Sequence, residues 1–319
     1  GILFLMSIMR FELFFKSALE LRRQVPFLKK SGIYRVNLPN KGKQNPMADW
    51  CAQLKEVYPD VDICPHYSLK YQYYGSPEKT FAHFEKFCAA LPTIGIQQCL
   101  LISGGGKKRK SDLSTLACLQ MAQRRRNSSI HKIEIGSAFN PYFPKDEQRA
   151  EERKTLKLKL STGLVSSVWI QIGSDDKLLR EGLTFIKDIE KKHTDMKLEI
   201  YGSVFLPSGR LLNQMRFRPW NGVFLSEKYL SDIESANEIT LNMLKTYAEF
   251  DVTVLCETSI RGDIDIRRFQ NFLQHYDNNM VSKPSTDTCK LNAGACINTS
   301  DNSPSVNTYM YVESESKKE

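Results

Sequence analysis

The stretch KIEIGSAFNPYFPKDEQRAEERKTLKLKLST, residues 132–162, joins two sequence patterns. Its first part, Lys132–Phe139, is a short β-rich run, and its second, 145–162, has the apolar spacing of a helix. The same unit recurs along the chain. The other β runs are Arg10–Phe15, Gly32–Leu38, Val61–Tyr67, Gln97–Ile102, Ser167–Ile172, Lys197–Phe205 and Val252–Glu257. The other helical stretches are 16–30, 46–57, 77–90, 111–126, 175–192, 208–217 with 230–249, and 263–275.

Eight β runs that are each followed by a helix predict an α/β fold, a single (β/α)8 TIM barrel over residues 1–276. A doubly wound open sheet uses the same local units and is the alternative. The count of eight and the length of 319 residues favour the barrel. Residues 277–319 are polar with few large apolar side chains. Such a segment buries too little surface to offset its ordering entropy, so a disordered C-terminal tail is expected.

The composition is that of an ordinary globular protein, with 41% hydrophobic and 25% charged residues. The net charge of +9 permits a polyanionic partner without requiring one. The dense basic clusters, Lys107–Lys110 and Arg124–Arg126, have no interleaved aromatic residues, so no nucleic acid is expected as a partner. No apolar run reaches the length of about 18 residues that a membrane-spanning helix needs. A homo-oligomer is left open.

The eight cysteines form no C-x-x-C pair, and most sit inside apolar runs. Free core thiols of this kind are typical of a reducing compartment, so a cytoplasmic location is expected. The five histidines are widely scattered, and no zinc or iron centre is predicted. Gly104–Gly106 is a lone glycine run that lacks the spacing of a dinucleotide-binding loop.

In a (β/α)8 barrel the chemistry lies at the carboxyl ends of the strands. That rule selects Glu12, the Asn37–Asn40 turn, His66, Ser103–Gly105, Phe139–Phe143, Gln171, Phe205–Ser208 and Glu257. The set holds two carboxylates, one histidine and one glutamine amide without a metal cluster. Such side chains favour acid–base work beside an organic cofactor.

Six of these strand-end segments resemble the methylenetetrahydrofolate reductase family, in the same order, over about residues 10–260. They are Arg10–Phe15, Cys64–Ser68, Gly95–Gly105, Ala138–Pro144, Lys157–Gly163 with Trp169–Gln171, and Gly202–Pro207. The resemblance implies a (β/α)8 barrel that binds FAD. It also implies reduction of 5,10-methylenetetrahydrofolate to 5-methyltetrahydrofolate, with hydride passing from NAD(P)H through the flavin.

The resemblance also implies roles for individual residues. Glu12 matches the family's general acid, and burial that raises its pKa is expected because it must hold a proton near neutral pH. Gln171 matches the glutamine that holds the pterin ring, and His66 matches a histidine next to the flavin. Lys159 and Glu152 match residues near the flavin phosphates or ribose, although a solvated helix face explains both equally well.

The sequence departs from the family where the flavin would bind. The family's Arg-Gly-Asp is Ser103-Gly104-Gly105 here, its turn tyrosine is Phe139, and its turn histidine is Phe143. These changes remove charge and hydrogen-bonding groups, so weak FAD binding is expected unless Lys107–Lys110 reaches the phosphates. Two alternatives therefore stay open: a non-catalytic barrel that binds folate, a nucleotide or a protein partner, and a barrel enzyme that uses Gly104–Gly106 as a phosphate loop.

Overall fold

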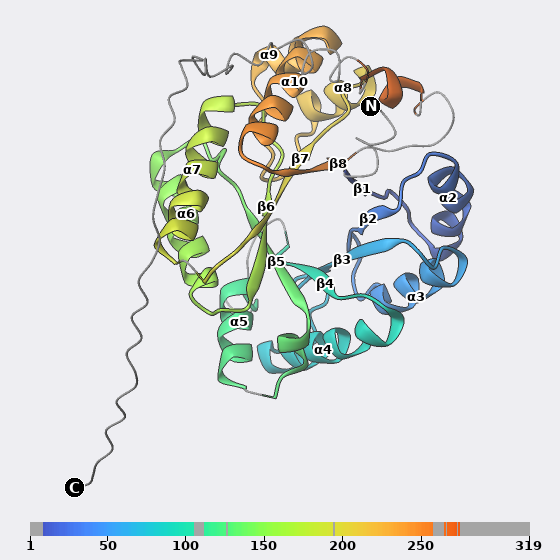
Figure 1. Ribbon diagram of the computed structural model, residues 1–319, viewed down its shortest axis with the longest axis vertical. Helices are drawn as coiled ribbons and strands as arrows, with labels where there is room; N and C mark the ends of the chain where they lie inside the picture. Colours follow the sequence, from blue (N-terminus) through green and yellow to red (C-terminus); the bar gives the residue numbers. More distant parts are fainter. Residues whose placement is uncertain are drawn as a thin grey trace, which may run out of the picture. The chain divides into compact units, whose positions relative to one another are not determined.

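The computed structural model describes residues 9–104, 112–125, 127–193, 195–257, 265, 267–272 and 274. Eight parallel strands close into a barrel in the order β1 to β8 (Figure 1). The predicted (β/α)8 fold is thereby confirmed. The predicted tail at 277–319 and the basic run Lys107–Lys110 lie outside the described residues. The strands are β1 (Arg10–Glu12), β2 (Arg35–Leu38), β3 (Asp62–Ser68), β4 (Gln98–Ile102), β5 (Glu134–Phe139), β6 (Val165–Ile170), β7 (Glu199–Val204) and β8 (Thr253–Glu257).

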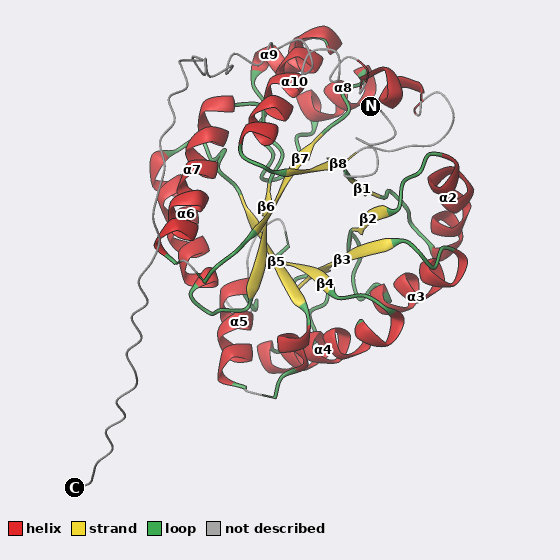
Figure 2. Cartoon of the chain, viewed as in Figure 1, coloured by secondary structure: helices red, strands yellow, loops and turns green. Residues whose placement is uncertain are grey.

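Helices surround the strands, as Figure 2 shows by colour. Residues 265, 267–272 and 274 are also helical, within the helix predicted over 263–275. No helix in the described part of the chain has the length and apolarity needed to cross a bilayer. The helices are α2 (Ala18–Lys30), α3 (Met47–Val57), α4 (Pro77–Ala90), α5 (Thr115–Arg124), α6 (Asp146–Leu160), α7 (Asp176–Lys192), α8 (Gly209–Phe217), α9 (Glu227–Ser231) and α10 (Ile233–Glu249).

Polar side chains at the strand–helix junctions fix where several helices begin. Ser76 accepts a hydrogen bond from the backbone N–H of Lys79, directly before Pro77 opens α4. Asp175 does the same for α7 through the N–H of Leu178. Each cap satisfies a backbone donor that the first helical turn leaves free. These two caps thus fix where α4 and α7 begin.

Apolar side chains fill two separate layers. The larger core lies between strands and helices, where Val36, Ile135 and Val168 of the strands are fully buried. The barrel interior holds a smaller cluster made of Cys64, Leu100, Trp169, Tyr201 and Leu255. The rings of Trp169 and Tyr201 stack there with their centroids 3.9 Å apart. The barrel interior is therefore a packed core.

The described cysteines are free thiols, and all of them are buried. Three of them lie on β3, β4 and β8, and three lie on α3, α4 and α5. They are Cys51, Cys64, Cys88, Cys99, Cys118 and Cys256. Burial raises the pKa of the Cys64 thiol to about 12, so this group stays protonated at neutral pH.

Candidate functional site

Two carboxylates meet at the carboxyl mouth of the barrel. Glu12 is the last residue of β1 and Glu257 the last residue of β8. The two are register partners on neighbouring parallel strands, so their side chains leave the same face of the sheet. Glu12 is buried. The strand-end rule selected both residues, but the predicted site included only Glu12.

A lysine and a serine distinguish the two carboxyl groups. Lys41, in the loop after β2, places its Nζ 3.0 Å from Glu12 Oε1. Glu257 instead accepts a hydrogen bond from Ser203. Burial, and then the charge of Glu12, raise the pKa of Glu257 to about 8. At neutral pH the Glu257 side chain therefore holds a proton beside the ion-paired Glu12.

His66 on β3 lies beside Glu12. Its Nδ1 lies 3.9 Å from Glu12 Oε2, and its Nε2 lies 2.9 Å from Asn37 Nδ2. Burial lowers the pKa of His66 to about 4, against the upward effect of Glu12, and Lys41 and Arg10 lower it further. His66 is therefore neutral at pH 7. The structure thus brings together Glu12 and His66, which the sequence predicted as site residues.

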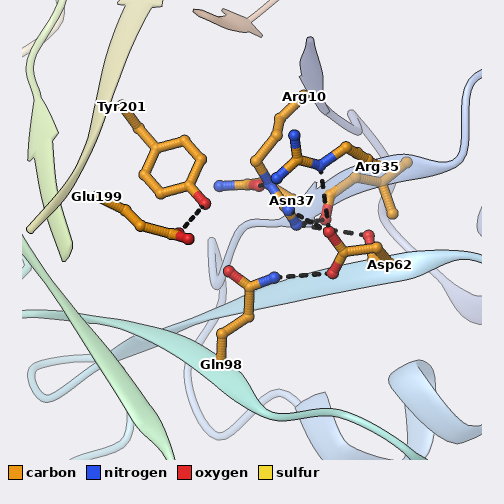
Figure 3. Close-up of polar contacts among 8 residues, drawn as sticks. Arg10, Arg35, Asn37, Asp62, Gln98, Glu199 and Tyr201 are labelled. Atoms are coloured by element: carbon orange, nitrogen blue, oxygen red, sulfur yellow. Dashed lines mark hydrogen bonds and ion pairs between the residues drawn. The ribbon is translucent and has the colours of Figure 1, made fainter. Parts of the chain in front are cut away.

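Asn37, the partner of His66, also belongs to a polar network around Arg10 in the barrel interior, which Figure 3 shows. Arg10, fully buried, donates from Nε to Asn37 Oδ1 at 2.8 Å and from a terminal nitrogen to Asp62 Oδ2 at 2.6 Å. Asp62 also accepts from Arg35 at 3.3 Å and Gln98 at 2.7 Å. Burial alone would raise the pKa of Asp62, but Arg10 and Arg35 hold it below its ordinary value.

Sequence reasoning missed Arg10 and Lys41 as parts of this site. Arg10 begins a short strand, where an arginine ordinarily points to solvent. Lys41 stands in a loop among other polar residues. The one available signal was the charge of Arg10 at the start of an otherwise apolar strand that ends in Glu12. A positive charge two residues from Glu12 lies on the same face of that strand.

A cavity of about 530 Å³ opens beside Glu257. Its walls come from the segments that follow β1, β7 and β8. Trp220 packs edge-on against Phe205 at the end of β7, with ring centroids 5.3 Å apart. The cavity therefore combines aromatic walls, two arginines and the protonated carboxyl of Glu257. The lining residues are Phe14, Leu206, Ser208, Arg210, Leu211, Gln214, Trp220, Glu257, Asp265 and Arg268.

Gln171 lies at the same end of the barrel, directly after β6. Its backbone N–H donates to Phe139 O, which continues the sheet ladder by one residue. Its side-chain oxygen accepts a hydrogen bond from the N–H of Ile172 at 2.9 Å. The amide is thus held by its own loop, and the predicted contact with a pterin ring stays a prediction.

The residues predicted to hold FAD make other contacts, and the cavity beside Glu257 is lined by different side chains. Ser103 Oγ accepts from the N–H of Thr115, at the start of α5. Gly104 has a φ of +90°, and an added Cβ would lie 2.7 Å from atoms of Lys70 and Ser68. Gly105 lies outside the described residues.

The predicted flavin contacts around β5 and α6 are likewise engaged. Phe139 packs against Phe185 in the layer between barrel and helices, and Phe143 packs against Phe224. Glu152 accepts from the N–H of Asn140, and Lys159 Nζ donates to Ala138 O. In the described part of the chain these residues secure the loop after β5. The flavin contacts predicted for them stay predictions.

The chain matches no known family profile and no curated protein. Solved structures do resemble it. An uncharacterized protein from Clostridium thermocellum, described as binding two copies of 5-methyl-5,6,7,8-tetrahydrofolic acid, aligns with a TM-score of 0.57. It is 11% identical, and the match covers 86% of this chain and 96% of that one. A thermostable chitinase domain from Pyrococcus furiosus aligns with a TM-score of 0.50 at 10% identity, over 87% and 97% of the two chains. At these identities the likeness establishes the barrel fold alone.

Proposed function

We propose that this barrel binds a reduced folate at its carboxyl mouth, with the pterin ring against Glu12 and Glu257. The observation that carries the proposal is the pair itself, one ion-paired carboxylate beside one carboxyl with a pKa raised to about 8. The strand-end resemblance to methylenetetrahydrofolate reductases supports the choice of ligand. The folate named for the Clostridium thermocellum barrel supports it as well.

The chemistry of a pterin suits this pair. The pyrimidine edge of the ring presents N–H donors, which a carboxylate such as Glu12 accepts. The ring also carries nitrogen and oxygen acceptors, to which a protonated Glu257 donates. Phe14 and Trp220 supply apolar walls for the flat ring system, and Arg210 and Arg268 supply cations for the glutamate carboxylates of folate.

Calorimetric titration with 5-methyltetrahydrofolate tests the proposal. In Glu12→Gln the carboxylate acceptor is lost, and we expect affinity to fall about tenfold or more, a free-energy change of about 1.4 kcal/mol. In the wild type, affinity falls above about pH 8 because Glu257 ionises beside Glu12. Glu257→Gln keeps a donor at every pH, so its affinity stays flat across that range. Glu151→Gln, on the exposed face of α6, is the matched control. Absence of binding, or equal affinities for all four proteins, would contradict the proposal.

The second candidate is the reductase activity itself, with FAD and NAD(P)H. The observation that favours it is the position of Glu12, buried at the end of β1 where the resemblance implies a general acid. A flavin titration joined to menadione-linked NAD(P)H oxidation tests it. Flavin-dependent turnover would support the reductase. No flavin binding at any concentration, together with folate binding, would support a non-catalytic folate-binding barrel.

A further inference from the structure

Arg10 determines which way the amide of Asn37 faces. A guanidinium has only donors, so the Asn37 atom 2.8 Å from Arg10 Nε must be the acceptor, Oδ1. Arg10 is itself immobilised. Asp62 binds it on one side, and the stacked rings of Trp169 and Tyr201 lie 6.0 and 5.9 Å from its Cζ. The Asn37 amide nitrogen is thereby directed away from Arg10.

Asn37 in turn determines which nitrogen of His66 carries the proton. The amide nitrogen of Asn37 is a donor, and it lies 2.9 Å from His66 Nε2. His66 Nε2 must therefore accept. A neutral imidazole has one donor and one acceptor nitrogen, so its proton is on Nδ1. That nitrogen is the one that faces Glu12, 3.9 Å from Oε2.

We propose that Arg10 and Asn37 are positioning residues that hold His66 as the neutral Nδ1–H tautomer, with this N–H directed at Glu12. The inference rests on the proposed function only in giving Glu12 a ligand to contact. Lys41 faces Oε1 of the same carboxylate. Glu12 thus has one cation and one neutral N–H directed at its two oxygens, which fixes the orientation of the carboxylate at the mouth.

The charged groups around His66 are consistent with a neutral ring. Glu12 and Arg10 face it from β1, and Lys41 faces it from the loop after β2. The two cations and the burial of the ring disfavour imidazolium, and they outweigh the single carboxylate. A neutral ring donates through one nitrogen only. The direction of the Asn37 amide therefore decides which group that N–H faces, and here the group is Glu12 Oε2, 3.9 Å from Nδ1.

Imidazole ¹⁵N NMR of the ligand-free full-length protein tests the tautomer directly. Each histidine nitrogen reports whether it is protonated, and the signals of His66 are assigned by their loss in His66→Gln. We expect a protonated Nδ1 and a bare Nε2 from about pH 5.5 to 8. This measurement needs no variant of Asn37, so it stands even where such a variant fails to fold.

Asn37→Asp tests whether Asn37 determines the tautomer of His66. Aspartate accepts from Arg10 with one oxygen and presents the other oxygen to His66, so Nε2 must gain a proton. Asn213→Asp is the matched control, because Asn213 also accepts from an arginine, Arg216, at an exposed site on α8. The inference holds if Nε2 is protonated in Asn37→Asp and bare in the wild type and Asn213→Asp.

A protonated Nε2 in the wild type would overturn the inference, as would an Asn37→Asp protein whose Nε2 stays bare. Both readouts are taken without folate. A chain that shows the expected tautomer but fails to bind 5-methyltetrahydrofolate would therefore refute the proposed function and leave the positioning role standing.

Discussion

Arg10 is a fully buried charge, and Asp62 is the carboxylate that neutralises it. Asp62→Asn leaves the guanidinium without a charged partner, and we expect the free energy of unfolding to fall by about 3 kcal/mol. This is the lower end of the usual range, because the Asp62 side chain is 37% exposed. Urea unfolding at pH 7 measures the change, with the exposed Asp60→Asn as control.

The ion pair of Arg10 and Asp62 predicts that the free energy of unfolding depends on pH. The pKa of Asp62 is depressed in the folded protein, so its stabilising contribution is fully present above the unfolded value of about 3.9. That contribution is lost as the pH falls through the folded pKa. Asp62→Asn should therefore lose less stability than the wild type between about pH 4 and pH 2. Parallel curves for the two proteins over this range would contradict the assignment.

The contribution of Glu257 to stability changes with pH in the opposite direction. Its folded pKa is raised to about 8, so from about pH 4 to 8 the folded chain binds more protons than the unfolded chain. Its contribution to stability is therefore lost as the pH rises through that window. We expect Glu257→Gln to melt at least about 2 °C above the wild type at pH 8, and to lose this advantage near pH 4. Calorimetry at the two pH values measures it, with Glu151→Gln as control.

At the level of single residues, the strand-end rule predicted Glu12 and His66 because position along a barrel strand determines which mouth a side chain reaches. It did not predict the partners. Lys41 comes from a loop, and its direction depends on contacts such as the ring of Phe14, 3.8 Å from its Nζ. Phe139, which was predicted to bind the cofactor, faces the layer between barrel and helices, because successive strand residues face opposite sides of the sheet.

Between neighbouring elements, Gly136 of β5 leaves room for the ring of Trp169 on β6, because glycine has no side chain. A Cβ on Gly136 would lie 2.3 Å from Nε1 of Trp169. Gly136→Ala must displace that ring from its stack on Tyr201, and we expect a loss of about 1–3 kcal/mol. A shifted Trp emission and a lower urea midpoint measure it. Gly209→Ala is the control, because its Cβ meets only Ile233 Cδ1, at 3.9 Å. An unchanged midpoint for Gly136→Ala would show that the interior accommodates the methyl.

The predicted strand boundaries agree with the structure where the buried apolar residues also pair with a neighbouring strand. For β3 the prediction was Val61–Tyr67 and the strand is Asp62–Ser68. They diverged where apolar residues are buried without strand pairing. The predicted run Arg10–Phe15 ends as a strand at Glu12. Leu13 is buried and its N–H still donates to Asn37 O at 3.0 Å, whereas Phe15 packs edge-on against Trp50 of α3, with centroids 5.2 Å apart. Apolar content alone does not distinguish these two ways of burying a side chain.

For the whole molecule, the segment after β8 packs on β1, one of the two strands that close the barrel. Phe269 and Phe272 are buried, and Phe269 packs edge-on against Phe11 of β1 at 5.0 Å. We expect a chain that ends at residue 276 to melt as the full-length protein does. A chain that ends at 262 loses both rings and should be unfolded or aggregated, since each Phe→Ala change in a core costs about 3–5 kcal/mol. A folded protein ending at 262 would show that the segment is dispensable.

The barrel was predictable from sequence because eight repeats of one local unit leave few topologies. The contacts made by the residues predicted to bind the cofactor were not predictable in this way. Whether Ser103 or Glu152 faces a ligand or its own loop depends on how two loops pack. That packing is set by single hydrogen bonds, such as Glu152 to the N–H of Asn140.

The buried cysteines allow the local opening of the fold to be followed by chemical labelling. A thiol reagent reaches a sulfur only after the element that carries it opens, and the rate of labelling then reports the free energy of that opening. The labelling rates would report the opening of three strands through Cys64, Cys99 and Cys256. They would report the opening of three helices through Cys51, Cys88 and Cys118. With Cys289 and Cys296 replaced by serine, mass spectrometry would follow six labelling rates in one sample, five of them from the β3–β4 side of the barrel and one from β8.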